Sequence, residues 1–73
     1  MAANDPAIGV RIRARRVARR VTQFALADAL GITSEQLRQY ETGRSSISAR
    51  RLQQIAKLLG APVTAFTSPD SKA

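Results

Sequence analysis

The sequence contains no cysteine, no histidine and no tryptophan, and only three of its 73 residues are aromatic. Without cysteine there is no disulfide framework and no thiolate metal site. Without histidine the chain lacks the commonest general base and the commonest metal ligand. The five acidic residues are scattered along the chain, so no pair of carboxylates suggests acid–base chemistry. We therefore predict that the chain is not an enzyme and binds no metal and no cofactor.

Long apolar runs are also missing. No stretch approaches the roughly 20 apolar residues that a membrane-spanning helix needs. Residues 1–6 have none of the apolar character of a signal peptide. We expect one small domain in the cytoplasm, with no membrane contact and no evident small-molecule site.

Positive charge, by contrast, is abundant. Twelve Lys and Arg residues stand against five acids, a formal net charge of +7. Ten of the twelve are arginines, and eleven lie between Arg11 and Lys57, so the ordered domain carries the charge. The arginine side chain presents a planar fork of donors that fits phosphates and guanine edges. The balance favours a polyanionic partner, and a merely solubilising surface is the alternative.

Apolar spacing and capping residues predict an all-α fold. No stretch alternates strictly enough to indicate a strand. In the first helix Ile8 and Ile12 share an inward face, and Val10 and Val17 belong to a weaker second stripe. The helices are expected at about 6–20, 23–30, 33–42 and 49–59, followed by a short fifth helix opened by Pro62. These place a folded domain at 7–66, between a frayed segment at 1–6 and a disordered tail at 67–73.

The segment around Gly31 is the most informative part of the chain. A helix of about two turns is followed by a glycine suited to a left-handed helix end. A second helix then begins with Thr33 and Gln36 in the spacing of a capping box. This order is that of a helix-turn-helix, in which the second helix lies in the major groove of DNA. On its own, such spacing occurs by chance in many helical proteins.

Longer stretches add weight to this pattern. Residues 8–66 resemble the phage-repressor and Cro-type helix-turn-helix family, often called the XRE family, and look most like its bacterial members. The matching stretches are IGVRIRARR at 8–16, TQFALADALGI at 22–32, YETGR at 40–44 and LQQIAKLLG at 52–60. The resemblance implies a five-helix bundle of the lambda-repressor-like type that binds operator DNA as a dimer.

The resemblance also implies which residues read the bases. They would lie on the outward side of the helix at 33–42, because Leu37, Tyr40 and Glu41 take its inward positions. The base-reading residues are then Ser34, Glu35, Arg38 and Gln39. Gln suits adenine, Arg suits guanine, and Glu accepts from cytosine. Glu35 is either such a reader or a discriminator against other sequences, or it simply stabilises the positive end of its helix.

Further positions are expected to touch the DNA backbone or to hold the fold. Among them Gln23, Arg44, Ser45 and Ser46 match family residues that contact phosphates. The expected phosphate contacts are Gln23, Gln36, Arg44, Ser45, Ser46, Arg11 and Arg15. Arg16 and Glu41 match an ion pair that joins the first helix to the end of the third, and we favour a partly buried pair over an exposed one.

Three positions depart from the family. Gln36 stands where the recognition helix of the family often has Ser or Thr. Arg20 stands where a glycine often ends the first helix, so the turn that follows it is either strained or differently placed. Phe24 stands at an outward position that is usually charged. It either packs back on the first helix or contacts another chain or DNA sugars.

The most economical reading is a transcriptional regulator, a repressor that binds a pseudo-palindromic operator as a homodimer and is associated with the nucleoid. Val63 and Phe66, with the end of the fourth helix, are the expected dimer surface. The alternative is an antitoxin-like or adaptor domain whose main partner is another protein. RNA binding is less favoured, because it usually uses stacking aromatic residues, and this chain has few.

Overall fold

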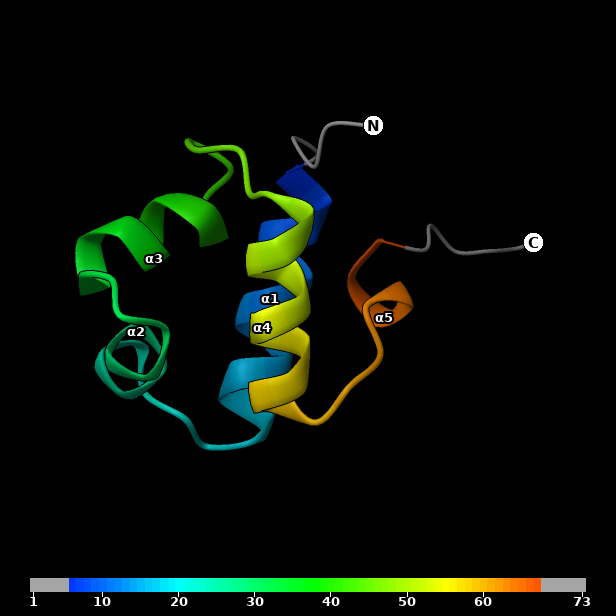
Figure 1. Cartoon of the computed structure of the whole chain (residues 1–73), viewed down its shortest axis with the longest axis horizontal. Coiled ribbons are helices and arrows are strands. Elements are labelled where there is room, and N and C mark those ends of the chain that lie inside the picture. The colour runs from blue at the N-terminus through cyan, green and yellow to red at the C-terminus, as the bar shows by residue number, and fades with distance from the viewer. Residues whose placement is uncertain (1–5, 68–73) are drawn as a thin grey trace.

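The computed structural model describes residues 6–67, which form five helices (Figure 1). The helices are α1 (Pro6–Ala18), α2 (Gln23–Leu30), α3 (Ser34–Glu41), α4 (Ala49–Leu59) and α5 (Thr64–Thr67). The predicted all-α, five-helix fold is confirmed. Pro6 begins α1, as expected for the helix at about 6–20, and Thr67 belongs to α5 although it was assigned to the tail. The other residues of the predicted frayed and disordered segments lie outside the described residues.

The helix starts follow the capping residues seen in the sequence. A side-chain oxygen accepts a free backbone amide at three of them, in the pairs Thr22–Ala25, Thr33–Gln36 and Ser48–Arg51, at 3.0, 3.0 and 3.1 Å. Each such cap is typically worth about 1 kcal/mol. Among the hydrogen bonds within residues 6–67 there is none from the Gln36 side chain, so only the Thr33 half of the capping box forms.

Three predicted boundaries shift for simple reasons. Helix α3 is one residue shorter at each end than expected, because Thr33 and Thr42 are its caps. Helix α5 begins at Thr64 rather than at Pro62. The Pro62 carbonyl instead accepts the Ala65 amide at 2.9 Å, in the turn that leads into the helix.

Helix α1 contacts α3, α4 and α5 and is the centre of the packing. Figure 1 shows α2 and α3 on one side of α1 and α4, with α5 on the other. The core is built from every helix and from one loop residue: Ile8, Ile12, Leu26, Ala27, Leu37, Ile47, Leu52, Ile55, Ala56, Leu59 and Phe66. The second stripe proposed for α1 comprised Val10, Ala14, Val17 and Val21. Val10, Ala14 and Val17 are exposed, and only Val21 packs against the core.

Helix α1 lies very close to the end of α3 at Gly9. A Cβ atom at this position would lie 2.6 Å from the Glu41 carbonyl oxygen, and it would be even closer to that of Tyr40. Both atoms belong to the backbone, which cannot move aside as a flexible side chain can. A residue without a side chain is therefore required here, and the contact fixes how near the end of α3 lies to α1.

Helix α1 ends at Ala18, two residues earlier than predicted. Among the described residues other than glycine, Arg20 alone has a positive φ, at 61°. The Val21 amide donates to the Arg16 carbonyl at 3.0 Å across this residue, as in a Schellman helix end. A left-handed conformation costs an ordinary residue roughly 1–2 kcal/mol. The strained turn that the family departure suggested is therefore present.

This strain predicts the effect of Arg20→Gly. Glycine adopts a positive φ without penalty, so we expect the free energy of unfolding to rise by roughly 0.5–1 kcal/mol. Urea denaturation measures it, with Arg20→Ala as the matched control, since alanine removes the charge but keeps the Cβ. Equal midpoints for the two variants would show that the backbone conformation of Arg20 is not strained.

Candidate nucleic-acid interface

A buried ion pair joins α1 to the end of α3. Arg16 Nε donates to Glu41 Oε2 at 2.7 Å, and Arg16 Nη2 donates to Glu41 Oε1 at 3.2 Å. The two residues are only 8% and 4% exposed. Such a two-pronged pair is both strong and directional. The structure thus contains the expected pair, in its buried form.

The same pair binds the segment between α1 and α2. Arg16 Nη1 donates to the Val21 carbonyl at 2.9 Å, just beyond the strained Arg20 turn. Gln23 Nε2 donates to Glu41 Oε1 at 3.0 Å. Arg16 and Glu41 therefore join three helices, and they hold the first residue of α2 against the last residue of α3. Gln23, predicted to touch phosphate, is positioned by this bond.

The outward side of α3 carries a second, exposed group of polar side chains. Arg38 donates to Glu35 through Nε at 3.2 Å and through Nη2 at 3.0 Å. Gln39 Nε2 donates to the same carboxylate at 3.4 Å. The hydrogen bonds from Arg38 and then from Gln39 hold the pKa of the Glu35 carboxyl below its ordinary value. Glu35 is therefore ionised at neutral pH.

The loop after α3 extends this group. Ser45 Oγ donates to Gln39 Oε1 at 3.0 Å, so the Gln39 amide is held at both ends. The amides of Arg44 and Ser45 both donate to the Gln39 carbonyl, at 2.9 and 3.2 Å. The segment predicted to touch phosphates is thus attached to the side of α3 that is predicted to read bases.

The structure brings most of the predicted interface together. Arg38 and Gln39 follow Glu35 by about one turn of α3, and each donates a hydrogen bond to its carboxylate. Ser34 and Gln36 are partly buried on the same short helix, and Arg44 is exposed in the loop that follows. Ser46, the last of the predicted phosphate contacts, is exposed two residues further on.

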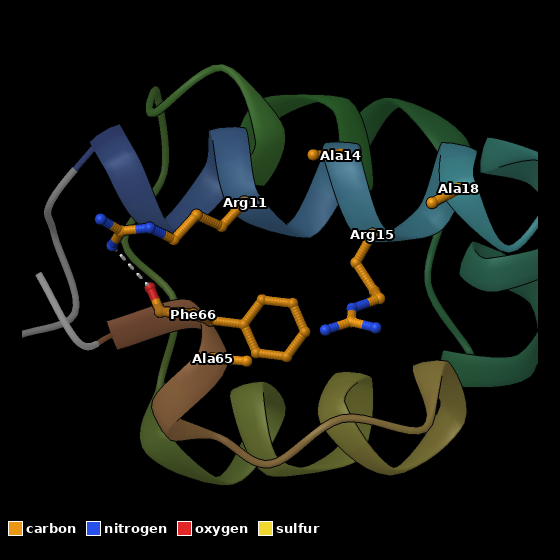
Figure 2. A pocket seen from close by; sticks show the side chains of 6 residues that line it. All are labelled: Arg11, Ala14, Arg15, Ala18, Ala65 and Phe66. Atoms are coloured by element: carbon orange, nitrogen blue, oxygen red, sulfur yellow. Dashed lines mark hydrogen bonds between the residues drawn. The ribbon is translucent and has the colours of Figure 1, made fainter. Parts of the chain in front are cut away.

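Arg11 and Arg15 lie elsewhere. They line a shallow hollow of about 360 Å³ between α1 and α5, together with Ala14, Ala18, Ala65 and Phe66 (Figure 2). Arg11 Nη1 donates to the Phe66 carbonyl at 3.2 Å. At 100° per residue, Arg11 is on the opposite face of α1 from Gly9, which touches α3. The structure therefore does not bring these two arginines together with the predicted contacts on α3, and their contact with phosphate stays a prediction.

Three apolar predictions are also resolved. Phe24 is 71% exposed, so its packing against α1 is wrong and a contact outside the chain remains open. Phe66 is 1% exposed and belongs to the core, which excludes it from a dimer surface. Its companion Val63 is only partly buried, and Tyr40 packs against the core as expected.

Within residues 6–67 no helix combines the length and the apolar character needed to cross a bilayer. Across the same residues, no three acidic, His or Cys side chains come together in a way that could hold a metal ion.

Comparison with known families identifies the family to which this chain belongs. The helix-turn-helix family model HTH_3 matches residues 12–66, from the middle of α1 to α5. This chain belongs to the XRE-type helix-turn-helix family. The resemblance drawn from the sequence is confirmed.

Relatives of this helix-turn-helix domain are named as regulators. This chain is 44% identical over 64 residues to a transcriptional regulator from the ATPase CF(0) region of Rhodospirillum rubrum. The match covers 88% of this chain and 59% of that protein. The chain is 42% identical over 62 residues to an HTH-type transcriptional regulator of Sinorhizobium medicae, with coverages of 85% and 45%. The chain thus spans about half the length of the curated relatives it matches.

Solved structures agree with the fold. The regulator of clp genes ClgR from Corynebacterium glutamicum is 31% identical and superposes with a TM-score of 0.82, covering 85% of this chain and 66% of that one. The restriction-modification controller protein C.AhdI from Aeromonas hydrophila superposes with a TM-score of 0.78 at 24% identity, covering 85% and 91%. The second likeness concerns the fold alone.

Sequence reasoning missed two roles in this helix-turn-helix domain. The first is the bonding of Glu35 to Arg38 and Gln39, since Glu35 was considered only as a reader of bases, a discriminator or a stabiliser of the helix start. Residues three and four apart on a helix are neighbours, so the spacing of Glu35 from Arg38 and Gln39 could have indicated these bonds. Sequence reasoning also assigned no role to Arg51, whose Nη1 donates to the Leu30 carbonyl at 3.0 Å and caps the end of α2. No local signal identifies that contact, since 21 residues separate the two partners.

The buried pair predicts a large effect of Glu41→Gln. The substitution strands the Arg16 guanidinium without a counter-charge, which typically costs about 3–5 kcal/mol. For so small a domain this is most of the stability, so the urea midpoint should fall steeply or the fold be lost. Glu35→Gln, in an exposed pair, is the matched control and should leave the midpoint nearly unchanged.

A double variant keeps this prediction testable even if the single variant does not fold. Arg16→Met with Glu41→Leu removes both charges and fills the site with apolar atoms, which often restores or exceeds the original stability. A double variant as unstable as Glu41→Gln would indicate that shape, rather than charge pairing, limits the site.

Proposed function

We propose that this helix-turn-helix domain binds double-stranded DNA in a sequence-specific manner and serves a transcriptional regulator. Helix α3 would lie in the major groove, with Arg38, Gln39 and Ser34 facing base edges. The observation that carries the proposal is the division of α3 into two faces. Glu41 and Leu37 are buried against the protein, and the side that bears Arg38 and Glu35 is exposed.

Phosphate contacts would flank α3 on both sides. Gln23 stands at the start of α2, where unpaired backbone amides and the positive end of the helix attract an anion. Its bond to Glu41 holds it close to the end of α3. On the other side Arg44, Ser45 and Ser46 follow α3 directly, and Gln36 lies on the helix itself. Such contacts set the register on the duplex, and the base contacts supply the specificity.

The finer features of the proposal follow the family. The regulator would be a repressor that binds as a homodimer to a pseudo-palindromic operator, with two α3 helices about 34 Å apart. With Phe66 buried, an apolar contact between copies would use exposed Leu58 at the end of α4 and the partly buried Val63. Its place in the cell would be the cytoplasm, at the nucleoid.

Selection of bound sequences from a random DNA pool tests the function. We expect a defined preferred sequence, and Gln39→Ala should lose the preference at one base pair, by roughly five- to 150-fold. Gln53→Ala, a change of the same residue type on the exposed side of α4, is the control and should keep the preference. A pool that is not enriched would contradict the proposal.

The dependence of binding on salt is a second readout of the same proposal. If one copy neutralises about five phosphates, log K should fall with log[salt] at a slope of roughly −4 to −5, and about twice that for a dimer.

The exposed Phe24 separates two possible partners. It directly follows Gln23, so we place it against sugars beside the phosphate contact. Phe24→Ser should then weaken binding several-fold on preferred and random DNA alike, as measured by fluorescence anisotropy. The antitoxin-like or adaptor reading instead places a protein on Phe24. Unchanged DNA affinity in Phe24→Ser would favour that alternative.

A further inference from the structure

We infer that Glu35 is a specificity-determining residue that acts by positioning Arg38 and Gln39 in the free protein, rather than by contacting a base. The inference rests on the proposed function, since it concerns how α3 reads DNA. Its basis is the geometry of one carboxylate that accepts three hydrogen bonds from two predicted readers.

The first part of the argument concerns the orientation of Arg38. A guanidinium has five N–H donors. Glu35 accepts from Nε and from one N–H of Nη2, which occupies one edge of the fork. Three N–H groups are left, and two of them, one on Nη1 and the second on Nη2, make up the outer end of the side chain. That end is the pair of donors that binds guanine O6 and N7. Glu35 therefore holds Arg38 with its guanine-binding edge presented outward.

The second part concerns Gln39. A carboxylate can only accept, so the Gln39 nitrogen must face Glu35 and its oxygen must face away. The oxygen accepts from Ser45 Oγ at 3.0 Å, which agrees with this orientation. One N–H and one lone pair of the amide then remain, and these are the groups that bind adenine N7 and N6. The orientation of this amide is thus set before DNA arrives.

The third part concerns the cost of binding. The side chains of Arg38 and Glu35 are 54% and 58% exposed. Without the hydrogen bonds between them, both side chains would therefore rotate freely in solvent. Ordering a long side chain at an interface lowers affinity, and a side chain that is already ordered avoids that cost. A negative charge on this face is also repelled by phosphates, which weakens binding to random sequences. The pre-ordering raises the ratio of specific to non-specific binding, because Arg38 and Gln39 meet base edges only on the preferred sequence.

Selection from a random pool, repeated with variants, tests the inference. Arg38→Ala should lose the preference for guanine at one base pair. Glu35→Ala and Glu35→Gln should weaken the preference at that same base pair by roughly three- to tenfold, a fraction of the full effect of a bidentate contact. The double variant Glu35→Ala/Arg38→Ala should lose no more there than Arg38→Ala alone, because Glu35 acts through Arg38.

Affinity for random DNA is the second readout. It should rise roughly two- to fivefold in Glu35→Gln at 0.1 M salt, since one charge repelled by phosphates is removed. Asp28→Asn removes the same charge from an exposed position on α2 and is the matched control. It should leave the guanine preference intact.

The outcomes separate the explanations. A change at a base pair that neither Arg38→Ala nor Gln39→Ala affects would show that Glu35 reads a base itself, and would overturn the inference. Unchanged preferences in both Glu35 variants would overturn it as well. If the wild-type protein enriches no sequence, the proposed function fails first.

NMR relaxation of the Arg38 Nε–H group tests the positioning without DNA. The group should be more ordered in the wild type than in Glu35→Ala. Equal mobility in the two proteins would contradict the inference, whatever the DNA selection gives.

Discussion

The buried bond between Arg16 and Glu41 is the interaction on which the rest of the structure depends. A charged pair in a core of this size is costly unless nearly every donor and acceptor is satisfied. Here the guanidinium also bonds the Val21 carbonyl, and the carboxylate also accepts from Gln23. One pair therefore sets the exit from α1, the start of α2 and the end of α3. Helices as short as α2 and α3, at eight residues each, are marginal by themselves and need such fixed neighbours.

Much of this fold is legible in the sequence, because its signals are local. Thr22, Thr33 and Ser48 mark the helix starts, and Gly31 and Gly60 mark two helix ends, at the positions where the structure places them. The ion pair was predicted only through the family resemblance. The two partners are 25 residues apart, so no local pattern in the sequence indicates that their side chains meet.

The features that sequence reasoning missed have a common physical origin. Periodicity shows that Val10 and Val17 share a stripe, but whether another helix covers that stripe depends on the tertiary arrangement. Likewise, the positive charge of Arg11 suits a phosphate and a helix carbonyl equally well. The structure shows it on the Phe66 carbonyl (Figure 2). The contact between Ser45 and Gln39 also escaped prediction, because it depends on the path of a loop.

The bare backbone contact at Gly9 has a consequence for how such proteins diversify. It presses α1 against the carbonyl end of α3, on the side away from Arg38 and Gln39. The residues that fix the packing of α1 against α3 and the residues proposed to read DNA are thus different ones. Under the proposed function, substitutions on the outer side of α3 after a gene duplication would change the DNA sequence that one copy prefers and leave the packing of the helices as it was.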